Sequence, residues 1–380
     1  MNLMVPFGFY GAGNVGDEST LQGFAKLVFR GRHGLRVWVG SRNPAHTANV
    51  EPAFVYFKAE GKDVRRWLAR TFSKGHLFAG GTPIADHLGK WPLCELAPLV
   101  SDAHLKGKPM VFVGIGTEEL ERAGSRQIMA DVIAPKVLHW SVRCERDKER
   151  LIEYGAAPDH VTVAADMAWM LDKESTEFGK KYLSQLNVDL SSNLVGVNVN
   201  NEKFVLDREP RLFEKLGTFL DAIVEKYGVR ILFFCNEVRE EESFDKVASQ
   251  KVQAHMRKPD HTFILPNRYW APQQILSLLG CCRLNIGMRY HFCLFSALQN
   301  VPFIALKRSG KVQDLCWDMD WPYGVSTDGL DVAALSTLYD EAELDRENVL
   351  KSLPQKAGVL RERALRNMVT LDALFERLRQ

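Results

Sequence analysis

NIGMRYHF, residues 285–292, and VPFIALK, residues 301–307, carry the clearest structural signal in this chain of 380 residues. Their pattern predicts a buried strand, a glycine turn, a helix and a second buried strand. Arg289 and His291 then lie where the first strand ends and the helix begins, and Lys307 lies at the end of the second strand. Ligands of open α/β sheets bind at the carboxyl ends of the strands, where a helix start offers unpaired N–H groups. Guanidinium and ammonium groups at that edge favour a carboxylate or a phosphate, and an imidazole there can transfer protons near neutral pH.

The composition is that of a soluble globular protein. The chain is 46% hydrophobic and 25% charged, and its formal charge of +2 is too small to indicate a nucleic-acid partner. Its seven cysteines show no CxxC pair and no zinc-type spacing, which predicts reduced thiols, no metal site and a cytoplasmic protein. Residues 1–10 are apolar but lack a basic start and a cleavage site, so we expect a first strand and no signal peptide. No apolar run reaches the roughly 20 residues of a membrane helix.

Strand and helix patterns alternate along almost the whole chain, which predicts an α/β protein. A polar stretch without periodicity, residues 172–192, separates two such series and is interpreted as a connection. We expect two Rossmann-like domains facing a cleft, an N-terminal domain at 1–175 and a C-terminal domain at 190–350. A charged segment with helical spacing, residues 351–380, is expected to pack back on the N-terminal domain. The predicted strands are Leu3–Phe9, Arg36–Gly40, Phe54–Phe57, His76–Ala79, Met110–Gly114, Val137–Val142, Val161–Ala164, Leu194–Val199, Val229–Phe234, Thr262–Leu265, Arg283–Ile286 and Phe303–Leu306. The predicted helices are Asp17–Phe29, Lys62–Phe72, Pro92–Lys106, Asp147–Tyr154, Leu212–Lys226, Glu241–His255, Pro272–Leu279 and His291–Gln299.

A glycine cluster at 8–18, GFYGAGNVGDE, follows the first predicted strand and precedes a helix. It contains the GxGxxG spacing of dinucleotide-binding loops, in which glycines let the backbone approach a pyrophosphate. The carboxylates of Asp17 and Glu18 would repel that anion, and no clear acidic ribose ligand follows about 20 residues on. We therefore predict a neutral, hydroxyl-rich ligand at this loop. For Asp17 the alternative is a helix cap.

Three further loops follow predicted strands: AGGTPIAD at 79–86, VGIGTE at 113–118 and SVRCERD at 141–147. The glycines of the first loop can bring backbone close to a ligand, although a tight turn with Asp86 as a surface acid is the other interpretation. Arg143 is expected to point into the cleft from the end of its strand. Arg146 and Asp147 are interpreted as a local ion pair at a helix start.

Basic residues gather behind the strand at 303–306, at Lys307, Arg308 and Lys311. Isolated surface lysines are usually solvated. Because these residues lie near Arg289 at adjacent strand ends, we predict that one or two of them bind an anion. His291 precedes several apolar residues, so a buried structural role is its alternative to proton transfer.

The segment Lys62–Lys74 predicts a basic amphipathic helix with Val64, Trp67, Leu68 and Phe72 on one face. Packing of this face in the core is one interpretation. Contact with a membrane surface that carries a lipid-linked acceptor is the other.

Taken in order, these pieces resemble the polysaccharide pyruvyl transferase family, over nearly the whole chain. The resemblance rests on Tyr10-Gly11-x-x-Asn14-x-Gly16-Asp17-Glu18, Gly80-Gly81 with Asp86, Gly114-Ile115-Gly116, Ser141-Val142-Arg143, Asp166, Ile286-Gly287-Met288-Arg289-Tyr290-His291, Val301-Pro302 and Lys311-Val312. It implies a two-domain fold like that of the GT-B glycosyltransferases. It also implies a transferase with phosphoenolpyruvate as donor substrate and no cofactor, working in the cytoplasm or at the inner face of the membrane. The product would be a pyruvate ketal on two hydroxyls of a sugar in a polysaccharide or a lipid-linked glycan precursor.

The candidate residues fit that chemistry. The carboxylate and phosphate of the donor need cationic partners, which Arg289, Arg143, Lys307 and Lys311 can supply. Proton transfer or phosphate binding is assigned to His291, and activation of the acceptor hydroxyl to Asp17. Acceptor binding is assigned to Asn14, Glu18 and Asp86.

Two other functions remain open from the sequence. A GT-B glycosyltransferase with a nucleotide-sugar donor would share the fold and the basic second domain. A glycan-binding protein without activity would also share the fold, because fold does not fix function.

Overall fold

The computed structural model describes all residues except 87, 88, 90 and 239–243, and it shows two compact units. The first unit comprises residues 1–12, 17–171 and 360–380, and the second comprises residues 13–16 and 172–359. The predicted boundaries at 175 and 190 lie near this division. Residues 13–16, however, belong to the second unit, and the C-terminal segment joins the first unit from Leu360 onward. That the two domains face a cleft stays a prediction.

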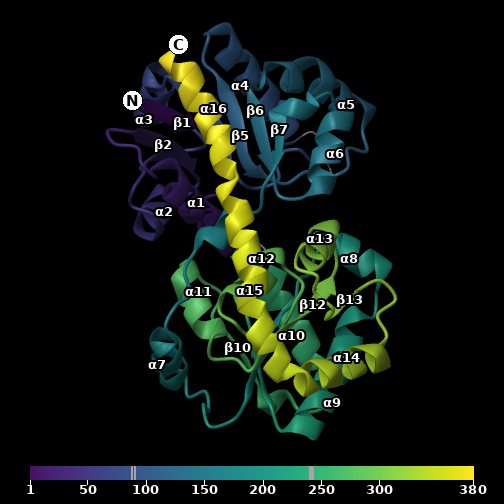
Figure 1. Cartoon of the computed structure of the whole chain (residues 1–380). Helices are drawn as coiled ribbons and strands as arrows, with labels where there is room; N and C mark the ends of the chain where they lie inside the picture. The colour runs from purple at the N-terminus through teal and green to yellow at the C-terminus, as the bar shows by residue number, and fades with distance from the viewer. Residues whose placement is uncertain (87–88, 90, 239–243) are drawn as a thin grey trace. The chain divides into compact units, whose positions relative to one another are not determined.

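The first unit is built on a sheet of seven parallel strands in the order β3-β2-β1-β4-β5-β6-β7 (Figure 1). The strands are β1 (Asn2–Val5), β2 (Arg36–Ser41), β3 (Val55–Lys58), β4 (Gly75–Ala79), β5 (Met110–Ile115), β6 (His139–Val142) and β7 (Val161–Val163). The helices of this half are α1 (Val15–Val28), α2 (Pro44–Val50), α3 (Val64–Phe72), α4 (Leu93–Leu105), α5 (Ala123–Ile128) and α6 (Glu145–Glu153), with short helical turns at Met129–Ile133, Ala134–Lys136, Pro158–His160 and Met167–Met170. Phe112 stacks on Trp140 at 4.4 Å between ring centroids, in the core beneath β5 and β6.

The second unit is built on six parallel strands in the order β10-β9-β8-β11-β12-β13. They are β8 (Leu194–Asn198), β9 (Arg230–Phe233), β10 (Thr262–Ile264), β11 (Leu284–Gly287), β12 (Phe303–Lys307) and β13 (Gly324–Ser326). Its helices are α7 (Glu177–Gln185), α8 (Lys203–Arg208), α9 (Leu212–Tyr227), α10 (Phe244–Ala254), α11 (Pro272–Leu279), α12 (Tyr290–Leu298), α13 (Gly310–Asp318) and α14 (Val332–Leu344), with a short turn at Pro259–His261. Both units are therefore Rossmann-like α/β domains. Among the described residues, none of the helices combines the length and the apolarity that a membrane span requires.

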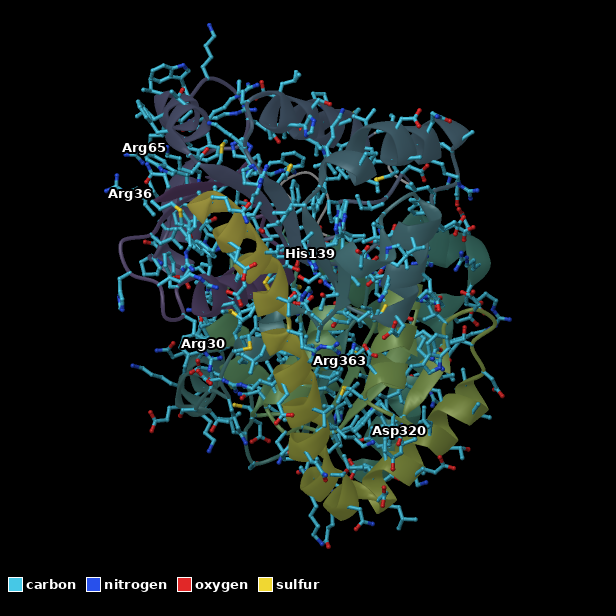
Figure 2. The ribbon with its side chains drawn as sticks, turned by 45° about the horizontal axis from the view of Figure 1, so that its top comes forward. Arg30, Arg36, Arg65, His139, Asp320 and Arg363 are labelled. Atoms are coloured by element: carbon cyan, nitrogen blue, oxygen red, sulfur yellow. The ribbon has the colours of Figure 1, made fainter. Side chains whose placement is uncertain are left out.

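Two C-terminal helices follow, α15 (Arg346–Leu365) and α16 (Asn367–Arg379). Helix α16 packs on β5 and β6 of the first unit. His139 of β6 hydrogen-bonds Thr370 at 2.9 Å, and Arg363 donates to the carbonyl oxygen of Arg143 at 2.9 Å. Figure 2 labels His139 and also Arg363, which belongs to α15. The C-terminal segment thus completes the first unit.

Several elements were not among the predicted ones. The stretch 172–192 is not an unstructured connection, because it contains α7. This helix buries little more than Gly179 and Leu183, and the Gly179 N–H donates to Ser277 Oγ of α11 at 2.9 Å. Such a short apolar face leaves no periodic signal, so packing on α11 decides its structure. Strand β13 and the helices α2, α5, α8, α13 and α14 also went unpredicted.

The strand order reverses once in each sheet. In the first unit the chain runs outward from β1 through β2 to β3 and then returns to place β4 on the other side of β1. In the second unit it runs from β8 through β9 to β10 and returns with β11. The crevice outside the carboxyl ends of the strands at such a reversal is where open α/β sheets bind ligands. Each unit therefore has one preferred place for a site, at β1/β4 and at β8/β11.

One glycine shows how tightly the first unit is packed. A methyl group on Gly23 of α1 would lie 1.8 Å from the carbonyl oxygen of Met167. We predict that Gly23→Ala lowers the free energy of unfolding by about 3 kcal/mol, because two backbones would have to separate. Gly358→Ala in α15 is the control. Its added methyl meets no atom of the described residues within 4 Å, so helix propensity should raise stability by roughly 0.5–1 kcal/mol. Denaturant unfolding measures both, and equal stabilities would refute the close contact.

Candidate active site

Polar residues line the carboxyl edge of the second sheet at its reversal point. Asn198 ends β8, Asn236 and Glu237 follow β9, and Arg289 follows β11 as the N-terminal flanking residue of α12. Arg289 thus lies between a strand end and a helix start, as predicted from the sequence. The edge is built from residues far apart in the chain, brought together by parallel pairing of β9, β8 and β11.

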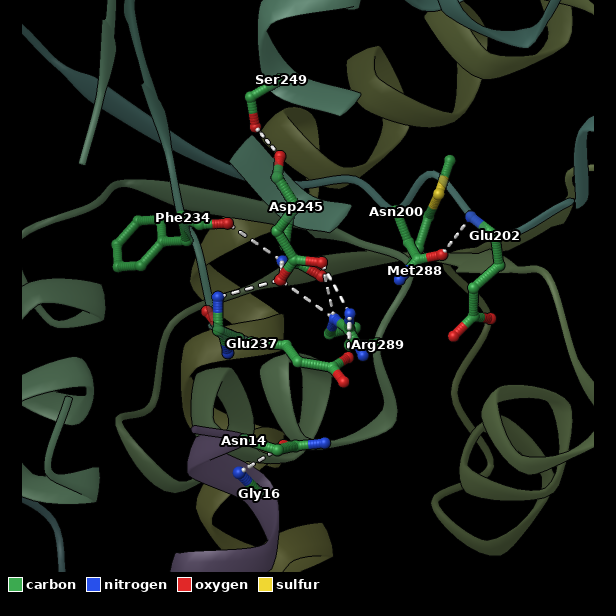
Figure 3. A network of polar contacts seen from close by, with 12 residues as sticks. Asn14, Gly16, Asn200, Glu202, Phe234, Glu237, Asp245, Ser249, Met288 and Arg289 are labelled. Carbon is green, nitrogen blue, oxygen red and sulfur yellow. Dashed lines mark hydrogen bonds and ion pairs between the residues drawn. The ribbon is translucent and has the colours of Figure 1, made fainter. Parts of the chain in front are cut away.

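Arg289 is held by two buried carboxylates. Its Nε donates to Asp245 Oδ1 and Oδ2 at 2.9 and 3.0 Å, and its Nη2 donates to Asp245 Oδ1 at 2.7 Å. The same Nη2 lies 2.5 Å from Glu237 Oε2. Figure 3 shows the guanidinium between these two acids. Burial opposes its charge, but the two carboxylates outweigh that effect and raise the pKa of Arg289.

Asp245 is in turn fixed by the strands around it. The backbone N–H of Asn236 donates to Asp245 Oδ2 at 2.9 Å, and Asn198 Nδ2 donates to the same oxygen at 3.2 Å. With these partners, Asp245 holds Nε and Nη2 of the guanidinium in one orientation. Nη1 of Arg289 makes no hydrogen bond to any residue that the structure describes. It is therefore the nitrogen that can still donate to a ligand.

Three buried asparagines lack hydrogen bonds that their amides could make. Within the described residues, no partner exists for Asn198 Oδ1, for Asn200 Nδ2 or for either amide atom of Asn236, although all three side chains are at most 2% exposed. A buried amide without a partner is costly, so such groups normally meet a water or a ligand. These atoms make the edge of the second sheet a candidate site for a polar ligand.

Residues 13–16 of the first glycine cluster belong to this edge. The Val15 N–H donates to the carbonyl oxygen of Asn236 at 3.0 Å, and the Val238 N–H donates to that of Gly13 at 2.8 Å. Asn14 is thereby bridged to Glu237, the partner of Arg289. Figure 3 shows Asn14 and Gly16 below this acid. The loop supplies backbone contacts to the second unit, which GxGxxG spacing alone does not reveal.

His291 lies in the first turn of α12, against the same loop. A methyl group on Gly16 would lie 2.1 Å from His291 Nδ1, so only glycine leaves room for the imidazole. The ring is half-buried and meets the Tyr290 ring edge to face at 5.1 Å between centroids. The structure thus gathers three predicted site residues, Asn14, Arg289 and His291, in the second unit.

Of the predicted lysines, Lys307 ends the neighbouring strand β12 and Lys311 lies in the helix that follows it. Gly287 of β11 pairs with Ala305 of β12, so Arg289 and Lys307 each lie two residues beyond the same pair. Lys311 lies in the first turn of α13, whose start has no side-chain cap. Arg308 links the two strand ends, because its Nε donates to the carbonyl oxygen of Met288 at 3.0 Å while its Nη1 pairs with Glu202.

The first unit has a small hollow at its own reversal point. It has a volume of about 20 Å³ and is lined by residues 7–10 after β1, by residues 78–83 at and after the end of β4, and by Asp17, Trp91 and Pro92. The Tyr10 hydroxyl donates to the carbonyl oxygen of Ala79, which joins the two loops. Phe9 and Trp91 meet edge to face at 5.0 Å between ring centroids. Asp17, which was predicted to activate the acceptor hydroxyl, therefore lines this hollow.

Glu18 and Asp86 are buried instead. Glu18 Oε1 accepts the N–H of Gly11 at 2.6 Å, and burial raises the pKa of Glu18 to about 8. Asp86 is not a surface acid, because it is 1% exposed and its oxygens accept the N–H groups of Glu121 and Arg122 at 3.2 and 2.9 Å. These contacts hold the loops around the hollow. Acceptor binding by either residue stays a prediction.

Arg143 lies at the end of β6 in the first unit and is also buried. Its Nη2 lies 2.9 Å from Asp166 Oδ2, and its Nε donates to the carbonyl oxygen of Gly114 at 3.2 Å. Its assignment to the donor stays a prediction. The expected ion pair of Arg146 with Asp147 is wrong, because Asp147 Oδ1 accepts the N–H and the hydroxyl of Thr117 at 2.7 and 2.8 Å.

Sequence reasoning missed Asn198, Asn200, Asn236, Glu237 and Asp245. The first four lie at the end of β8 or shortly after β8 and β9, and that position is the signal that could have found them. Asp245 carries no such signal, since it lies on α10. Within the described part of the chain, no group of three or more His, Cys, Asp or Glu side chains could hold a metal ion. The expectation of a site without metal stays a prediction.

The raised pKa of Glu18 makes stability depend on pH. Between its ordinary pKa near 4.5 and the folded value of about 8, the folded state binds a proton that the unfolded state releases. Stability from this group is therefore lost as pH rises through that window. We predict that Glu18→Gln, which keeps the acceptor for Gly11, gains up to about 3 kcal/mol relative to wild type between pH 5 and pH 8. Urea unfolding at both pH values measures the gain. Glu119→Gln, at an exposed site, is the control, and an equal gain there would refute the assignment.

Comparisons with known proteins agree with this architecture. The polysaccharide pyruvyl transferase family model matches residues 14–310. The fold is similar to that of HepE from Anabaena in complex with UDP and glucose, at a TM-score of 0.64 and 12% identity, covering 99% of each chain. It is also similar to UDP-GlcNAc 2-epimerase from Neisseria meningitidis bound to UDP-GlcNAc, at a TM-score of 0.62 and 8% identity, covering 99% of this chain and 100% of that chain.

A putative UDP-N-acetylglucosamine 2-epimerase from Listeria monocytogenes gives a TM-score of 0.65 at 11% identity, covering 99% of this chain and 96% of that chain. At these identities the structural likeness shows the fold alone, that of GT-B glycosyltransferases and related epimerases. No curated protein has a sequence that matches significantly. Since the family match extends over most of the sequence, this chain belongs to the polysaccharide pyruvyl transferase family.

Proposed function

We propose that the protein transfers a pyruvyl group from phosphoenolpyruvate to a sugar of a polysaccharide or of a lipid-linked glycan precursor. The product is a pyruvate ketal on two sugar hydroxyls, and inorganic phosphate is released. Family membership supports the reaction class. The observation that carries the donor site is the set of buried, unpartnered amide atoms at the reversal point of the second sheet.

The donor carries a carboxylate and a phosphate, and the second unit offers cations for both. Asp245 and Glu237 already occupy two nitrogens of Arg289, which leaves Nη1 for the carboxylate. Lys307, Lys311 and the uncapped start of α13 suit the phosphate, because a helix start adds N–H groups and partial positive charge. We assign the amides of Asn200 and Asn236 to the polar rim of the donor. Arg143 of the first unit stays an additional candidate.

The chemistry requires one proton to reach carbon. Protonation of the methylene carbon of phosphoenolpyruvate gives a methyl group and a cationic C2. A sugar hydroxyl adds to C2, the C–O bond to phosphate breaks, and the second hydroxyl closes the ring. The two hydroxyl protons balance the reaction, since one replaces the proton taken up by carbon and the other leaves on phosphate. His291 is assigned to proton transfer and Asp17 to the acceptor hydroxyl.

The acceptor is assigned to the first unit. Its hollow is too small to enclose a sugar, but its rim presents the aromatic rings of Phe9 and Trp91 and the carboxylate of Asp17, which suit the apolar face and the hydroxyls of a sugar lying against it. Asn14, Glu18 and Asp86 remain its further candidates. Because Glu18 and Asp86 are buried, we assign them to shaping the loops that contact the sugar.

A second candidate is transfer from a nucleotide sugar. HepE from Anabaena has the same fold, at a TM-score of 0.63 and 11% identity, and its structure was determined in complex with UDP-glucose. A lysine-rich edge would suit a diphosphate as well as a phosphate. Ligand binding separates the two donors.

The binding test uses thermal stability with phosphoenolpyruvate, UDP and UDP-glucose. Arg289 is unsuitable for substitution, because its loss would leave two buried carboxylates without a cation. Asn236→Ala is a more selective variant for this test. It removes an amide without partners, so the ligand-free protein should keep or raise its Tm, whereas a structural amide would lower it. We predict a Tm increase with phosphoenolpyruvate that Asn236→Ala and Lys311→Met reduce. Lys351→Met, on the exposed face of α15, should leave it unchanged.

A Tm increase with UDP or UDP-glucose instead would replace phosphoenolpyruvate by a nucleotide sugar as donor. If phosphoenolpyruvate raised the Tm equally in wild type and in both site variants, a donor site in the second unit would be contradicted. Absence of any shift would favour a glycan-binding role.

The activity test measures phosphate release from phosphoenolpyruvate in the presence of p-nitrophenyl hexosides. In D2O the methyl group of the ketal should carry one deuterium, which reports protonation at carbon. We predict that His291→Asn lowers the rate by about a hundredfold or more while phosphoenolpyruvate still raises the Tm. Undiminished phosphate release from this variant would exclude His291 as the proton-transfer group.

A further inference from the structure

Helix α3 presents its apolar face to solvent. Val64, Trp67 and Phe72 are 74%, 61% and 57% exposed, and Ala69 is its buried residue. The interpretation of this face as a core face is therefore wrong. Trp67 and Phe72 lie edge to face with 6.5 Å between ring centroids. A nine-residue helix with three large exposed apolar side chains is unusual on a soluble surface.

Cations surround this apolar face. Residues 58–74 contain six basic side chains and two acidic ones, a net charge of +4 in a chain whose total is +2. One of the acids, Asp63, caps α3 by accepting the N–H of Arg65 at 2.7 Å, and it also accepts the N–H of Lys58 at 2.7 Å. Figure 2 labels Arg65 at the outer rim of the first unit. The positive charge is therefore concentrated on one local surface.

The end of α4 extends that surface. Lys108 Nζ donates to the carbonyl oxygens of Arg70 and Thr71 at 2.7 and 3.1 Å, which fixes the end of α3 against the segment after α4. Asp102 bridges Arg70 and Lys106, at 2.9 and 2.8 Å. Leu105, in the last turn of α4, is 85% exposed. We call this region the α3 surface. It consists of the exposed apolar residues Val64, Trp67, Phe72 and Leu105 and the basic residues Lys58, Lys62, Arg65, Arg66, Arg70 and Lys74.

We propose that the α3 surface docks the protein on an anionic lipid membrane. Trp67 and Phe72 would enter the boundary between headgroups and acyl chains, where aromatic rings are favoured. The Arg and Lys side chains would meet the negative headgroups and keep their stems along the apolar face. A lipid bilayer fits better than an acidic protein, because this short stretch combines three large exposed apolar side chains with a local net charge of +4, and a bilayer offers both an apolar layer and negative headgroups. Where the acceptor is lipid-linked, which rests on the proposed function, this contact keeps the enzyme beside its substrate.

The test is co-sedimentation of the full chain with vesicles of phosphatidylcholine alone and of phosphatidylcholine with phosphatidylglycerol, without donor or acceptor. The expected result is binding to the anionic vesicles that is at least about tenfold stronger than to the neutral ones and weakens at high salt. The double variant Trp67→Ser/Phe72→Ser should lose about tenfold or more in binding. Arg65→Gln/Arg66→Gln should lose the preference for anionic lipid.

Trp317→Ser is the matched control, since Trp317 is 64% exposed in the second unit and lies outside the α3 surface. It should bind like wild type. Circular dichroism checks that each variant is folded. No binding to anionic vesicles at low salt, or equal binding by the double variant, would overturn the proposal. Because no substrate is present, such a result leaves the proposed transferase reaction untouched.

Discussion

The buried ion pair of Arg289 with Asp245 is the contact on which the second unit's site depends. It joins α10 to the loop between β11 and α12, and the Asn236 N–H and Asn198 side chain tie the same carboxylate to β9 and β8. Four elements that are distant in sequence are thereby fixed around one guanidinium. A buried pair of this kind is weak evidence for stability, because desolvation offsets the attraction. Its value here is geometric, since it orients one arginine nitrogen toward the edge where a ligand would lie.

Both units have their candidate site at the same position in the sheet, but the side chains at the two sites differ in chemistry. Each places its candidate site where strand order reverses, because parallel strands direct their carboxyl ends to one edge. At β8/β11 that edge holds charged and amide groups, and at β1/β4 it holds glycines, aromatic rings and Asp17. The loop at residues 13–16 belongs to the second unit although both flanking segments belong to the first. Asn14 and Gly16 are therefore better understood as parts of the Arg289 and His291 environment than as a dinucleotide loop.

The sequence was sufficient to predict every described strand except β13, and the position of Arg289, because hydrophobic runs and glycine turns are local signals. It was insufficient where long-range packing decides. Helix α7 depends on a contact with α11, and Asp245 lies 44 residues before the arginine that it holds. The sequence also does not reveal which side chains are exposed, because an amphipathic pattern shows that a helix has an apolar face but not what covers it. For that reason the interpretation of the Trp67 face as a core face and that of Asp86 as a surface acid are both wrong.

The charge at the second site limits how an anionic donor can bind. Arg289 and Arg308 are matched by Asp245, Glu237 and Glu202, two cations against three carboxylates and a net charge of −1. A trianionic donor seated on that cluster alone would be repelled. Lys307 and Lys311 add two positive charges to this edge, so for the proposed donor we expect the phosphate on the β12–α13 side and the carboxylate on the remaining Arg289 nitrogen. Because acids surround Arg289, charge alone would hold such a donor weakly, and we expect hydrogen bonds to the buried amides of Asn200 and Asn236 to contribute as well. In the proposed reaction, that combination would favour a compact donor with both a carboxylate and a phosphate.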